Sequence, residues 1–356
     1  MAIDPDFWRG RRVLVTGHTG FKGAWLSLWL GSLGADVAGL APPAREGSLY
    51  ERLRAGDRVR GHVADIRDGA AVAAALAAAQ AEVVIHLAGQ PLVRRSLRDP
   101  AGTYEVNVMG TVNVLEAVRT SGAPVRAVVL VTSDKCYENS AARTRPFTED
   151  DALGGSDPYS SSKACAELVA SAYRRSFGPL GGAARVATAR AGNVIGGGDR
   201  GEDRLLPDAV RAVEQATPLR VRNVEAVRPW QHVLNPLAGY LLLVQELWRS
   251  KHAQRPWNFG PAAGEARSVG WIAARLAELW QGELSWVADA TPQPPEAPHL
   301  LLDSGAAERE LAWRPAWGID EALERTVEWH RQERAGEDMR ARTLEQIDAF
   351  AAALDA

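Results

Sequence analysis

The chain has 356 residues, of which 46% are hydrophobic and 24% are charged, so it is long enough for about two domains with a large core. Its net charge of −3 gives no basic surplus of the kind that binds nucleic acid or an anionic membrane, so we expect neither partner. No apolar run reaches the roughly 18 residues of a membrane span, and the N-terminus resembles no signal peptide. Two cysteines, Cys136 and Cys165, lack metal-ligand spacing, so we expect a cytoplasmic protein without a metal centre.

Short aliphatic runs alternate with segments of helical period through the first half of the chain. We predict strands over 11–17, 35–40, 61–66, 81–89, 126–133 and 184–192, and helices over 21–34, 69–81, 110–122 and 161–177. The strands are apolar almost throughout, which is typical of a parallel sheet covered by helices on both faces. This alternation predicts an α/β fold, a doubly wound parallel sheet of the Rossmann type.

The character of the sequence changes after about residue 195, where glycines, prolines and most of the tryptophans are found. We assign residues 1–192 to a dinucleotide-binding Rossmann-type domain. Residues 193–335 are expected to form mainly a smaller substrate-binding region, with chain exchange between the two lobes allowed for, and residues 336–356 a helical tail. In a two-lobed α/β enzyme the cleft between the lobes is the usual ligand site.

Three glycines follow the first predicted strand at the start of the first long helix. Gly17, Gly20 and Gly23 are spaced three residues apart. Such a turn lets the backbone pass close to a pyrophosphate, and the helix N-terminus offers unpaired N–H groups to that anion. In the first βα unit of a doubly wound sheet this pattern predicts dinucleotide binding, and the alternative is a glycine-rich helix start without a ligand.

The second half of the dinucleotide pattern is altered. An acidic residue at the end of the second strand would accept the ribose hydroxyls, but Pro42 and Pro43 stand there and Asp36 lies at the wrong end of the strand. Arg45 follows, and it either accommodates a 2′-phosphate or is an exposed loop residue. The residues therefore leave the choice between NAD and NADP open. Asp65, at the end of the third strand, is a candidate to hold the adenine amino group.

Reactive side chains stand at the end of the fifth strand and at the start of the helix that follows. The strand 126–133 ends in Ser133, which is followed by Asp134 and Lys135, and the alternative for this charged pair is a solvated surface turn. Tyr159 and Lys163 share one helix face because they are four residues apart, with Pro158 at a first helical position and Asp157 as a candidate N-cap. A nearby cation favours the phenolate, so Lys163 is expected to lower the pKa of Tyr159 and make it a usable base.

Together, the glycine turn, the strings HLAGQ and NVMGT, Ser133 and the Tyr159/Lys163 pair resemble the extended short-chain dehydrogenase/reductase superfamily of NAD-dependent epimerases and dehydratases. The longer strings VTGHTGFKGAW, TSDKCYEN, DPYSSSKACAELV and RPWQHVLNPLAGYL are similar to one branch, the CDP-glucose 4,6-dehydratases. The resemblance runs from about residue 10 to about residue 330. It implies a nucleotide-sugar substrate and NAD as cofactor, with NADP not excluded.

The reaction that the resemblance implies is an internal redox elimination of deoxysugar and O-antigen biosynthesis. Hydride leaves sugar C4 for the nicotinamide, water is lost across C5 and C6, and hydride returns to C6, so that CDP-glucose becomes CDP-4-keto-6-deoxyglucose. The resemblance assigns the 4-hydroxyl proton to Tyr159, a hydrogen bond to the same hydroxyl to Ser133, and the nicotinamide ribose to Lys163. Asp134 and Lys135 remain for the elimination, where related sugar dehydratases carry an Asp-Glu pair.

The aspartate–lysine pair leaves two assignments open. A proton donor must be protonated and an amine base must be neutral, whereas the usual pKa values of about 3.9 and about 10.4 give the opposite charges at pH 7. Either burial raises the pKa of Asp134 and nearby cations lower that of Lys135, or Lys135 is the proton donor and Asp134 the base.

The resemblance also assigns two binding sets to positions of this sequence. The cofactor set comprises Gly17, Thr19, Gly20, Phe21, Lys22, Gly23, Asp65, Ile66, Leu87, Ala88, Gly89, Asn107, Thr132, Tyr159 and Lys163. The substrate set comprises Gln90, Ser133, Asn193, Arg204 and Arg228, with a plain strand-end loop as the alternative for Gln90 and an exposed ion pair as the alternative for either arginine.

The sequence assigns no firm role to three further residues. His86 lies in an apolar strand and is expected to be packed, His232 is ambiguous, and Trp230 is a candidate to border the nucleotide.

Extended members of the superfamily commonly pair through two long helices, here 103–122 and 161–177, so we expect a homodimer, with a tetramer as the alternative. The rival functions are a 4,6-dehydratase or 4-epimerase of another nucleotide sugar, or a non-catalytic cofactor-binding protein.

Overall fold

A seven-stranded parallel sheet forms the centre of the larger lobe in this computed structural model, which describes residues 2–140, 142–291 and 297–355. The strand order is β11-β6-β5-β4-β1-β2-β3, which confirms the predicted doubly wound sheet, and the order reverses between β1 and β4. The strands are β1 (Arg12–Thr16), β2 (Asp36–Ala41), β3 (Val59–Val63), β4 (Val83–His86), β5 (Ala127–Val131), β6 (Arg185–Ala191) and β11 (Pro256–Phe259).

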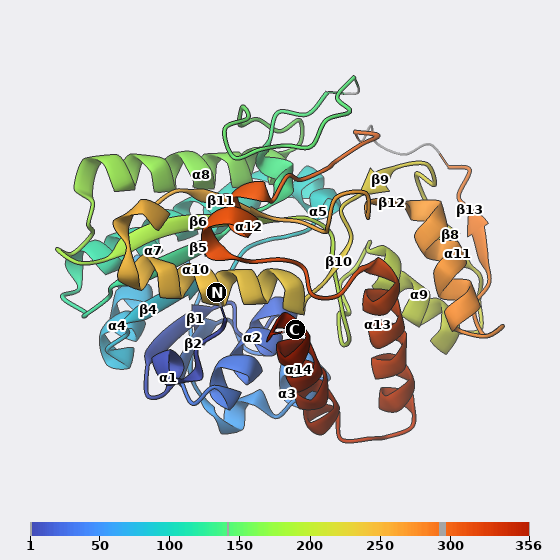
Figure 1. Ribbon diagram of the computed structural model, residues 1–356, viewed down its shortest axis with the longest axis horizontal. Coiled ribbons are helices and arrows are strands. Elements are labelled where there is room, and N and C mark those ends of the chain that lie inside the picture. The colour runs from blue at the N-terminus through green and yellow to red at the C-terminus, as the bar shows by residue number, and fades with distance from the viewer. Residues whose placement is uncertain (1, 141, 292–296, 356) are drawn as a thin grey trace.

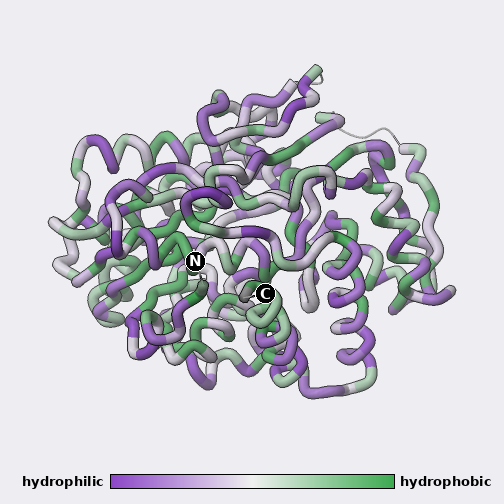
Figure 2. Tube along the Cα trace, in the orientation of Figure 1, coloured by the Kyte–Doolittle hydropathy of each residue, from purple (hydrophilic) through white to green (hydrophobic). Residues whose placement is uncertain are grey.

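Helices cover both faces of the sheet, as its apolar strands require (Figures 1 and 2). One face packs against α1 (Pro5–Trp8), α2 (Phe21–Ser32), α10 (Leu234–Arg249) and α12 (Gly305–Leu311). The other packs against α4 (Gly69–Ala79), α7 (Gly110–Thr120) and α8 (Pro158–Phe177). Two separate hydrophobic cores result, one on each side of the sheet.

The edge strand β11 was not predicted from the sequence. It belongs to the segment 193–335, yet it pairs in parallel with β6, so that part of the chain returns to the larger lobe. The strand is four residues long, begins with Pro256 and contains the buried polar Asn258. Proline is tolerated at the start of an edge strand, and a run this short and polar carries little signal for a strand.

The smaller lobe is built from helices around its own core, on the right of Figure 1. Its helices are α9 (Leu205–Glu214), α11 (Val269–Leu279) and α13 (Ile319–Arg334). Three two-stranded sheets complete the lobe: β7 (Val194–Ile195) with β10 (Gln231–His232), β8 (Leu219–Val221) with β13 (Trp286–Ala288), and β9 (Val227–Arg228) with β12 (Arg267–Ser268). Trp230 and Trp280 lie in its core.

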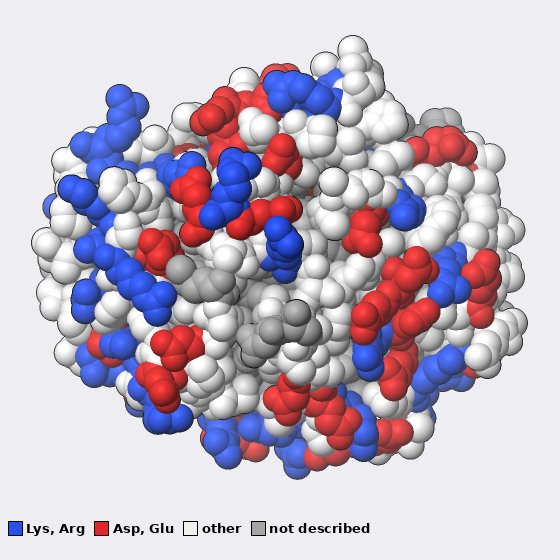
Figure 3. Space-filling model, in the orientation of Figure 1, with Lys and Arg blue, Asp and Glu red and all other residues white. Residues whose placement is uncertain are grey.

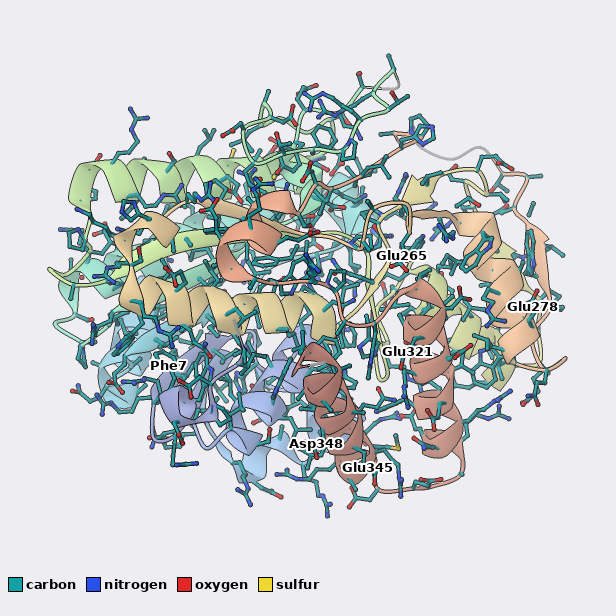
Figure 4. All side chains as sticks on the ribbon, viewed as in Figure 1. Phe7, Glu265, Glu278, Glu321, Glu345 and Asp348 are labelled. Carbon is teal, nitrogen blue, oxygen red and sulfur yellow. The ribbon has the colours of Figure 1, made fainter. Side chains whose placement is uncertain are left out.

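The C-terminal segment forms the helix α14 (Met339–Asp355), which packs against α2 and α13 of the molecule. Phe350 contacts the rings of Trp29 and Trp317 edge-on, and Trp329 Nε1 donates a hydrogen bond to Thr343 Oγ1 at 2.9 Å. Its outer side carries the exposed carboxylates Glu345 and Asp348 (Figure 4). The helix therefore packs against both lobes and joins them through a shared hydrophobic core.

Short elements link these units: α3 (Leu49–Arg52), α5 (Val93–Arg98), α6 (Pro100–Tyr104), the π-helical turn η2 (Glu105–Met109) and the 3₁₀ turns η1 (Ala55–Asp57), η3 (Asp134–Cys136) and η4 (Lys251–Ala253). Basic and acidic side chains are interspersed over the face shown in Figure 3. Across the described ranges, no helix is long and apolar enough to cross a membrane, and no group of His, Cys, Asp or Glu is arranged to hold a metal ion.

Candidate active site

The glycine turn after β1 has the close packing that a phosphate cradle requires. Gly17 has a φ of +73°, and a Cβ on it would lie 2.8 Å from the backbone of Ala88. A Cβ on Gly23 would clash with the carbonyl oxygen of Gly17. Since Gly20 caps α2 without a side-chain hydrogen bond, the first N–H groups of the helix are left for an anion.

A cleft of about 1830 Å³ begins at this turn, passes the ends of β4 and β5, and extends into the smaller lobe. Of the residues predicted for the site, all line this cleft except Asn107. The lining members are Gly17, Thr19, Gly20, Phe21, Lys22, Gly23, Asp65, Ile66, Leu87, Ala88, Gly89, Gln90, Thr132, Ser133, Asp134, Lys135, Tyr159, Lys163, Asn193, Arg204 and Arg228.

Asn107 lies behind the cleft wall and holds the loop after β4. Its Oδ1 accepts a hydrogen bond from the Gln90 backbone N–H at 2.8 Å, and its Nδ2 donates to the Gln90 carbonyl at 3.0 Å and to Ser162 Oγ at 2.9 Å. The amide side chain of Gln90 is also used internally, since it donates to Thr103 Oγ1 and accepts from the Leu92 N–H. Both residues therefore shape the loop, and Gln90 also lines the cleft.

Tyr159 and Lys163 project from the first turns of α8 into the cleft. The helix begins as predicted, with Pro158 at its first position and the Asp157 carboxylate accepting from the Ser160 N–H at 2.9 Å. Lys163 Nζ donates to the Val131 carbonyl at 3.3 Å, and a Cβ on Gly89 would lie 3.3 Å from it. Both side chains are only 8% exposed.

Burial controls the protonation of this pair. It raises the pKa of Tyr159 to about 12, against a hydrogen bond with Ser133, and the charge of Asp134 raises it further. Burial also lowers the pKa of Lys163 to about 8. The expectation of a lowered pKa at Tyr159 is therefore wrong, because the desolvation of a buried phenolate outweighs the hydrogen bond with Ser133 and the charge of Arg204.

Ser133, Asp134 and Lys135 leave the end of β5 in a 3₁₀ turn. Ser133 Oγ donates to Asp134 Oδ1 at 3.0 Å and accepts from the Lys135 N–H at 3.2 Å. Asp134 is 2% exposed, and its Oδ2 has no hydrogen-bond partner among the described residues. Burial raises the pKa of Asp134, although the charge of Lys135 opposes it. The solvated-turn alternative is therefore wrong for Asp134, while Lys135 remains partly exposed in the cleft.

The predicted substrate residues of the smaller lobe differ in their surroundings. Arg204 forms an ion pair with Asp199 at 2.9 Å and is half-buried at the cleft. Arg228 is 5% exposed and donates from Nη1 to the carbonyls of Val227 and Pro298, so the alternative of an exposed ion pair is wrong for Arg228. Asn193 lines the cleft beside them, and its carbonyl accepts from the Gln231 N–H.

The family model for GDP-mannose 4,6 dehydratase matches residues 14–326 of the chain. The chain belongs to this family. It is 46% identical to the CDP-glucose 4,6-dehydratase of Salmonella typhimurium, over 99% of each chain, which confirms the resemblance inferred from the sequence.

Solved structures of a related dehydratase and a related epimerase are similar to this chain. The dTDP-glucose 4,6-dehydratase of Streptomyces venezuelae, with NAD and TYD bound, is 26% identical with a TM-score of 0.78 and covers 92% of this chain and 99% of its own. The UDP-glucose 4-epimerase of Thermus thermophilus, in complex with NAD, is 26% identical with a TM-score of 0.76. The match covers 90% of this chain and 99% of the epimerase chain.

Behind the reactive residues of this dehydratase-family chain lies a buried ion pair that sequence reasoning missed. Glu167 accepts hydrogen bonds from Arg190 Nη2 at 2.9 Å, from Thr188 Oγ1 at 2.7 Å and from Thr132 Oγ1 at 2.5 Å. Arg190 also donates to Tyr137 Oη at 2.7 Å. Because Thr132 precedes Ser133, this network holds the end of β5. The sequence signal that could have revealed Glu167 is its position four residues after Lys163, on the same face of α8.

Within the described ranges, no carboxylate stands directly after β2, at one end of the cleft. Pro42 and Pro43 are exposed at the end of β2, as expected, and Arg45 is exposed beside them. Asp65 lines the cleft, but both of its carboxylate oxygens accept hydrogen bonds from Arg67. A ligand amino group would therefore have to share Asp65 with that arginine.

The two histidines in question are structural. His86 Nδ1 is 2.7 Å from Thr16 Oγ1, and burial lowers the pKa of His86 to about 3, so the expected packing role is confirmed. His232 lies edge-on to Trp25 and Trp317 in the core, where burial lowers its pKa to about 3 as well. Trp230 lines the cleft and donates to the Arg267 carbonyl at 3.1 Å.

Proposed function

We propose that this protein is a CDP-glucose 4,6-dehydratase that forms CDP-4-keto-6-deoxyglucose and water with NAD as cofactor. The observation that carries the proposal is the full-length similarity to the Salmonella enzyme, since 46% identity covers both chains end to end. The cleft supports it, because Asp134 supplies a buried carboxyl group beside the Tyr159/Lys163 pair. A 4-epimerase has no use for a group that protonates a leaving hydroxyl.

The residues present fit a dinucleotide. A Cβ on Gly20 would approach the Gly17 carbonyl to 3.3 Å, so only glycines leave this cradle open for a pyrophosphate. Lys163, under Gly89, is placed to hold the nicotinamide ribose, and Asp65 is the candidate for the adenine. The chemistry that NAD would supply when bound is the uptake of the C4 hydride and its return to C6.

In the oxidation, Tyr159 takes the proton of the 4-hydroxyl and Ser133 hydrogen-bonds the same oxygen. A phenol with a pKa of about 12 is protonated at pH 7 and cannot accept the proton, so the assignment requires additional positive charge that favours the phenolate when the site is filled. The charge of Arg204 already acts in that direction, because a cation favours the phenolate.

In the elimination, we assign the proton donor to Asp134 and the base for the C5 proton to Lys135. Burial raises the pKa of Asp134, which favours the protonated form that a donor needs. Its Oδ2 is buried without a partner in the described part of the chain, and a leaving 6-hydroxyl would satisfy it. Since the C4 ketone acidifies the C5 proton, the Lys135 amine in its neutral form is a sufficient base.

The substrate nucleotide takes the remaining end of the cleft. The cofactor would fill the part of the cleft from the glycine turn to Tyr159. The part in the smaller lobe, lined by Arg204, Arg228 and Trp230, is then left for the diphosphate and the base of the substrate. Guanidinium groups give forked hydrogen bonds to phosphate oxygens, and an indole offers a flat apolar face.

We also propose a homodimer through α7 and α8. Of the seven large hydrophobic residues that are exposed in the described part of the chain, five lie on or next to these helices: Leu97, Tyr104, Met109, Leu168 and Phe177. Exposed large apolar side chains are typical of an interface, and pairing α7 and α8 with the same helices of a second copy around a two-fold axis would bury several of them.

The test is to incubate the purified protein with CDP-, dTDP-, GDP- and UDP-glucose and to follow the mass of each product. The proposal predicts the loss of one water from CDP-glucose in preference to the others, and a 4-keto product that absorbs at alkaline pH. An Asp134→Asn variant should make no dehydrated product. A 4-epimer of unchanged mass, or dehydration of another nucleotide sugar alone, would contradict the proposal.

A further inference from the structure

The turn between β3 and α4 carries an aspartate–arginine pair at the cofactor end of the cleft. Asp65 and Arg67 both line the cleft, as do Pro42 and Pro43 at the end of the neighbouring strand β2. The resemblance assigns Asp65 to the adenine amino group, whereas Arg67 has no assigned role. A half-exposed ion pair is ordinarily a solvated surface feature, but this one stands where a dinucleotide would end.

The backbone of this turn is fixed on both sides. The Asp68 N–H donates to the Asp65 carbonyl at 3.0 Å, and the Asp68 carboxylate caps the N-terminus of α4. Asn113 Nδ2, on α7, donates to the carbonyls of Ile66 at 2.9 Å and of Arg67 at 3.0 Å. A ligand at this turn therefore meets side chains whose backbone positions are set in advance.

The Asp65 carboxylate has little acceptor capacity left. Its Oδ1 accepts from the Arg67 N–H at 2.9 Å and from Arg67 Nε at 3.1 Å, and its Oδ2 accepts from Arg67 Nη2 at 2.8 Å. A carboxylate offers about four lone-pair sites, so about one remains, on Oδ2. The hydrogen bonds with Arg67 also hold the pKa of Asp65 below its usual value, so this carboxylate has no proton to donate at pH 7.

The Arg67 guanidinium has the opposite surplus. Nε and Nη2 donate to Asp65, and Nη1 donates to Glu105 Oε2 at 3.3 Å. Each terminal nitrogen of a guanidinium carries a pair of N–H groups, and within the described part of the chain these contacts use one of each pair. Nη1 and Nη2 therefore each keep an N–H for a ligand. The aspartate–arginine pair as a whole offers more donors than acceptors.

We propose that Arg67 is a specificity-determining residue for the purine of the cofactor, in a site that accepts a keto group at position 6 as well as an amino group; this rests on the proposed function, with NAD as its cofactor. An amino group donates to the remaining lone pair of Asp65. A keto oxygen accepts from the spare N–H groups of Arg67, as it does when arginine binds the keto edge of guanine. A carboxylate without this arginine would admit only the amino group, because it has no proton for a keto oxygen.

The experiment measures the binding of NAD and of nicotinamide hypoxanthine dinucleotide, which carries a keto oxygen in place of the adenine amino group. Isothermal titration calorimetry on the full chain, freed of bound nucleotide, gives both dissociation constants without turnover. We expect the wild type to bind the two dinucleotides within about 10-fold of each other, less than the usual loss of a hydrogen bond to a charged group. A stronger preference for NAD would overturn the proposal.

The Arg67→Leu variant removes the spare donors and frees the Asp65 carboxylate. Its affinity for the hypoxanthine dinucleotide should fall by on the order of 10- to 100-fold relative to its affinity for NAD. Arg67→Lys should recover part of this loss, because an ammonium still donates although it cannot form the fork with Asp65. Equal losses for both dinucleotides in Arg67→Leu would mean that Arg67 only supports the turn, and the proposal would be wrong.

Arg60→Leu is the matched control. Arg60 lies on β3, forms an ion pair with Asp36 at 3.0 Å and is outside the cleft lining, so its replacement should change the affinity for neither dinucleotide. Should Arg67→Leu fail to fold, Arg67→Met takes its place with the same expectations.

Failure of this proposal and failure of the proposed function give different results. A protein that binds neither dinucleotide would refute NAD as the cofactor and this proposal with it. A protein that shows the expected selectivity but dehydrates no CDP-glucose would refute the proposed function alone.

Discussion

The buried Glu167–Arg190 pair makes a quantitative prediction about stability. Both residues are 2% exposed, and the Glu167 carboxylate accepts hydrogen bonds from Arg190, Thr188 and Thr132. Glu167→Gln keeps the shape but removes the charge, and its amide nitrogen then meets a donor. Removing one partner of a buried pair leaves the other uncompensated, so we expect a loss of about 3–5 kcal/mol in the free energy of unfolding.

The pH dependence of this effect follows from the direction of the shift. Burial alone would raise the pKa of Glu167, but the charge of Arg190 and the hydrogen bonds outweigh it and lower the pKa below its usual 4.5. A carboxyl whose folded pKa is lowered stabilises the fold above its unfolded pKa, and this contribution is lost as pH falls through the folded value. The difference between wild type and Glu167→Gln should therefore be full at pH 7 and shrink below about pH 4.5.

Urea unfolding of both proteins at a series of pH values is the assay. The double variant Glu167→Gln/Arg190→Met should recover part of the loss, since it removes the unpaired charge as well. A loss below about 1 kcal/mol at pH 7, the usual size for an exposed pair, would refute the view that this pair supports the end of β5.

The remaining predictions concern chemistry, cofactor and assembly. Lys135→Ala should still reduce the cofactor but stall before water leaves, whereas Tyr159→Phe should show almost no reduced cofactor, each slower by ~100- to 10,000-fold; turnover of Lys135→Ala at the wild-type rate would contradict this. Because Pro42 and Pro43 replace a carboxylate, calorimetry should find NAD binding that is weaker than usual for this fold, with some NADP binding; nanomolar NAD affinity without NADP binding would overturn it. Light scattering at micromolar concentration should find a dimer that Leu168→Lys converts to monomers, and a monomeric wild type would disprove the interface.

The sheet could be predicted because local and global signals agree in it. The strands β1, β2, β4 and β5 are largely aliphatic runs, and Asp157 and Pro158 mark the start of α8 by their own chemistry. β3 ends before the predicted range, at Val63 rather than 66, because the pattern gives no boundary there. β11 was missed because Asn258 is explained only by distant partners, Tyr137 and the Phe147 carbonyl.

The sequence predicts which residues make up the site, but not the burial and the pKa values of their side chains. Spacing brings Tyr159 and Lys163 together, yet the pKa of Tyr159 is set by how deeply the lobes bury it, which no local pattern encodes. The same holds for Asp134, whose burial depends on Gly192 and on the smaller lobe. The Arg190 side chain that pairs with Glu167 comes from another strand, so the pair appears only in three dimensions.

The most direct test of the account follows one deuterium atom. CDP-glucose labelled at C4 is converted by the purified protein with NAD, and the product is examined by mass spectrometry and NMR. The account predicts a CDP-4-keto-6-deoxyglucose that has lost one water and carries the deuterium at C6, with no net change in the cofactor. Deuterium retained at C4 of an undehydrated hexose would contradict it.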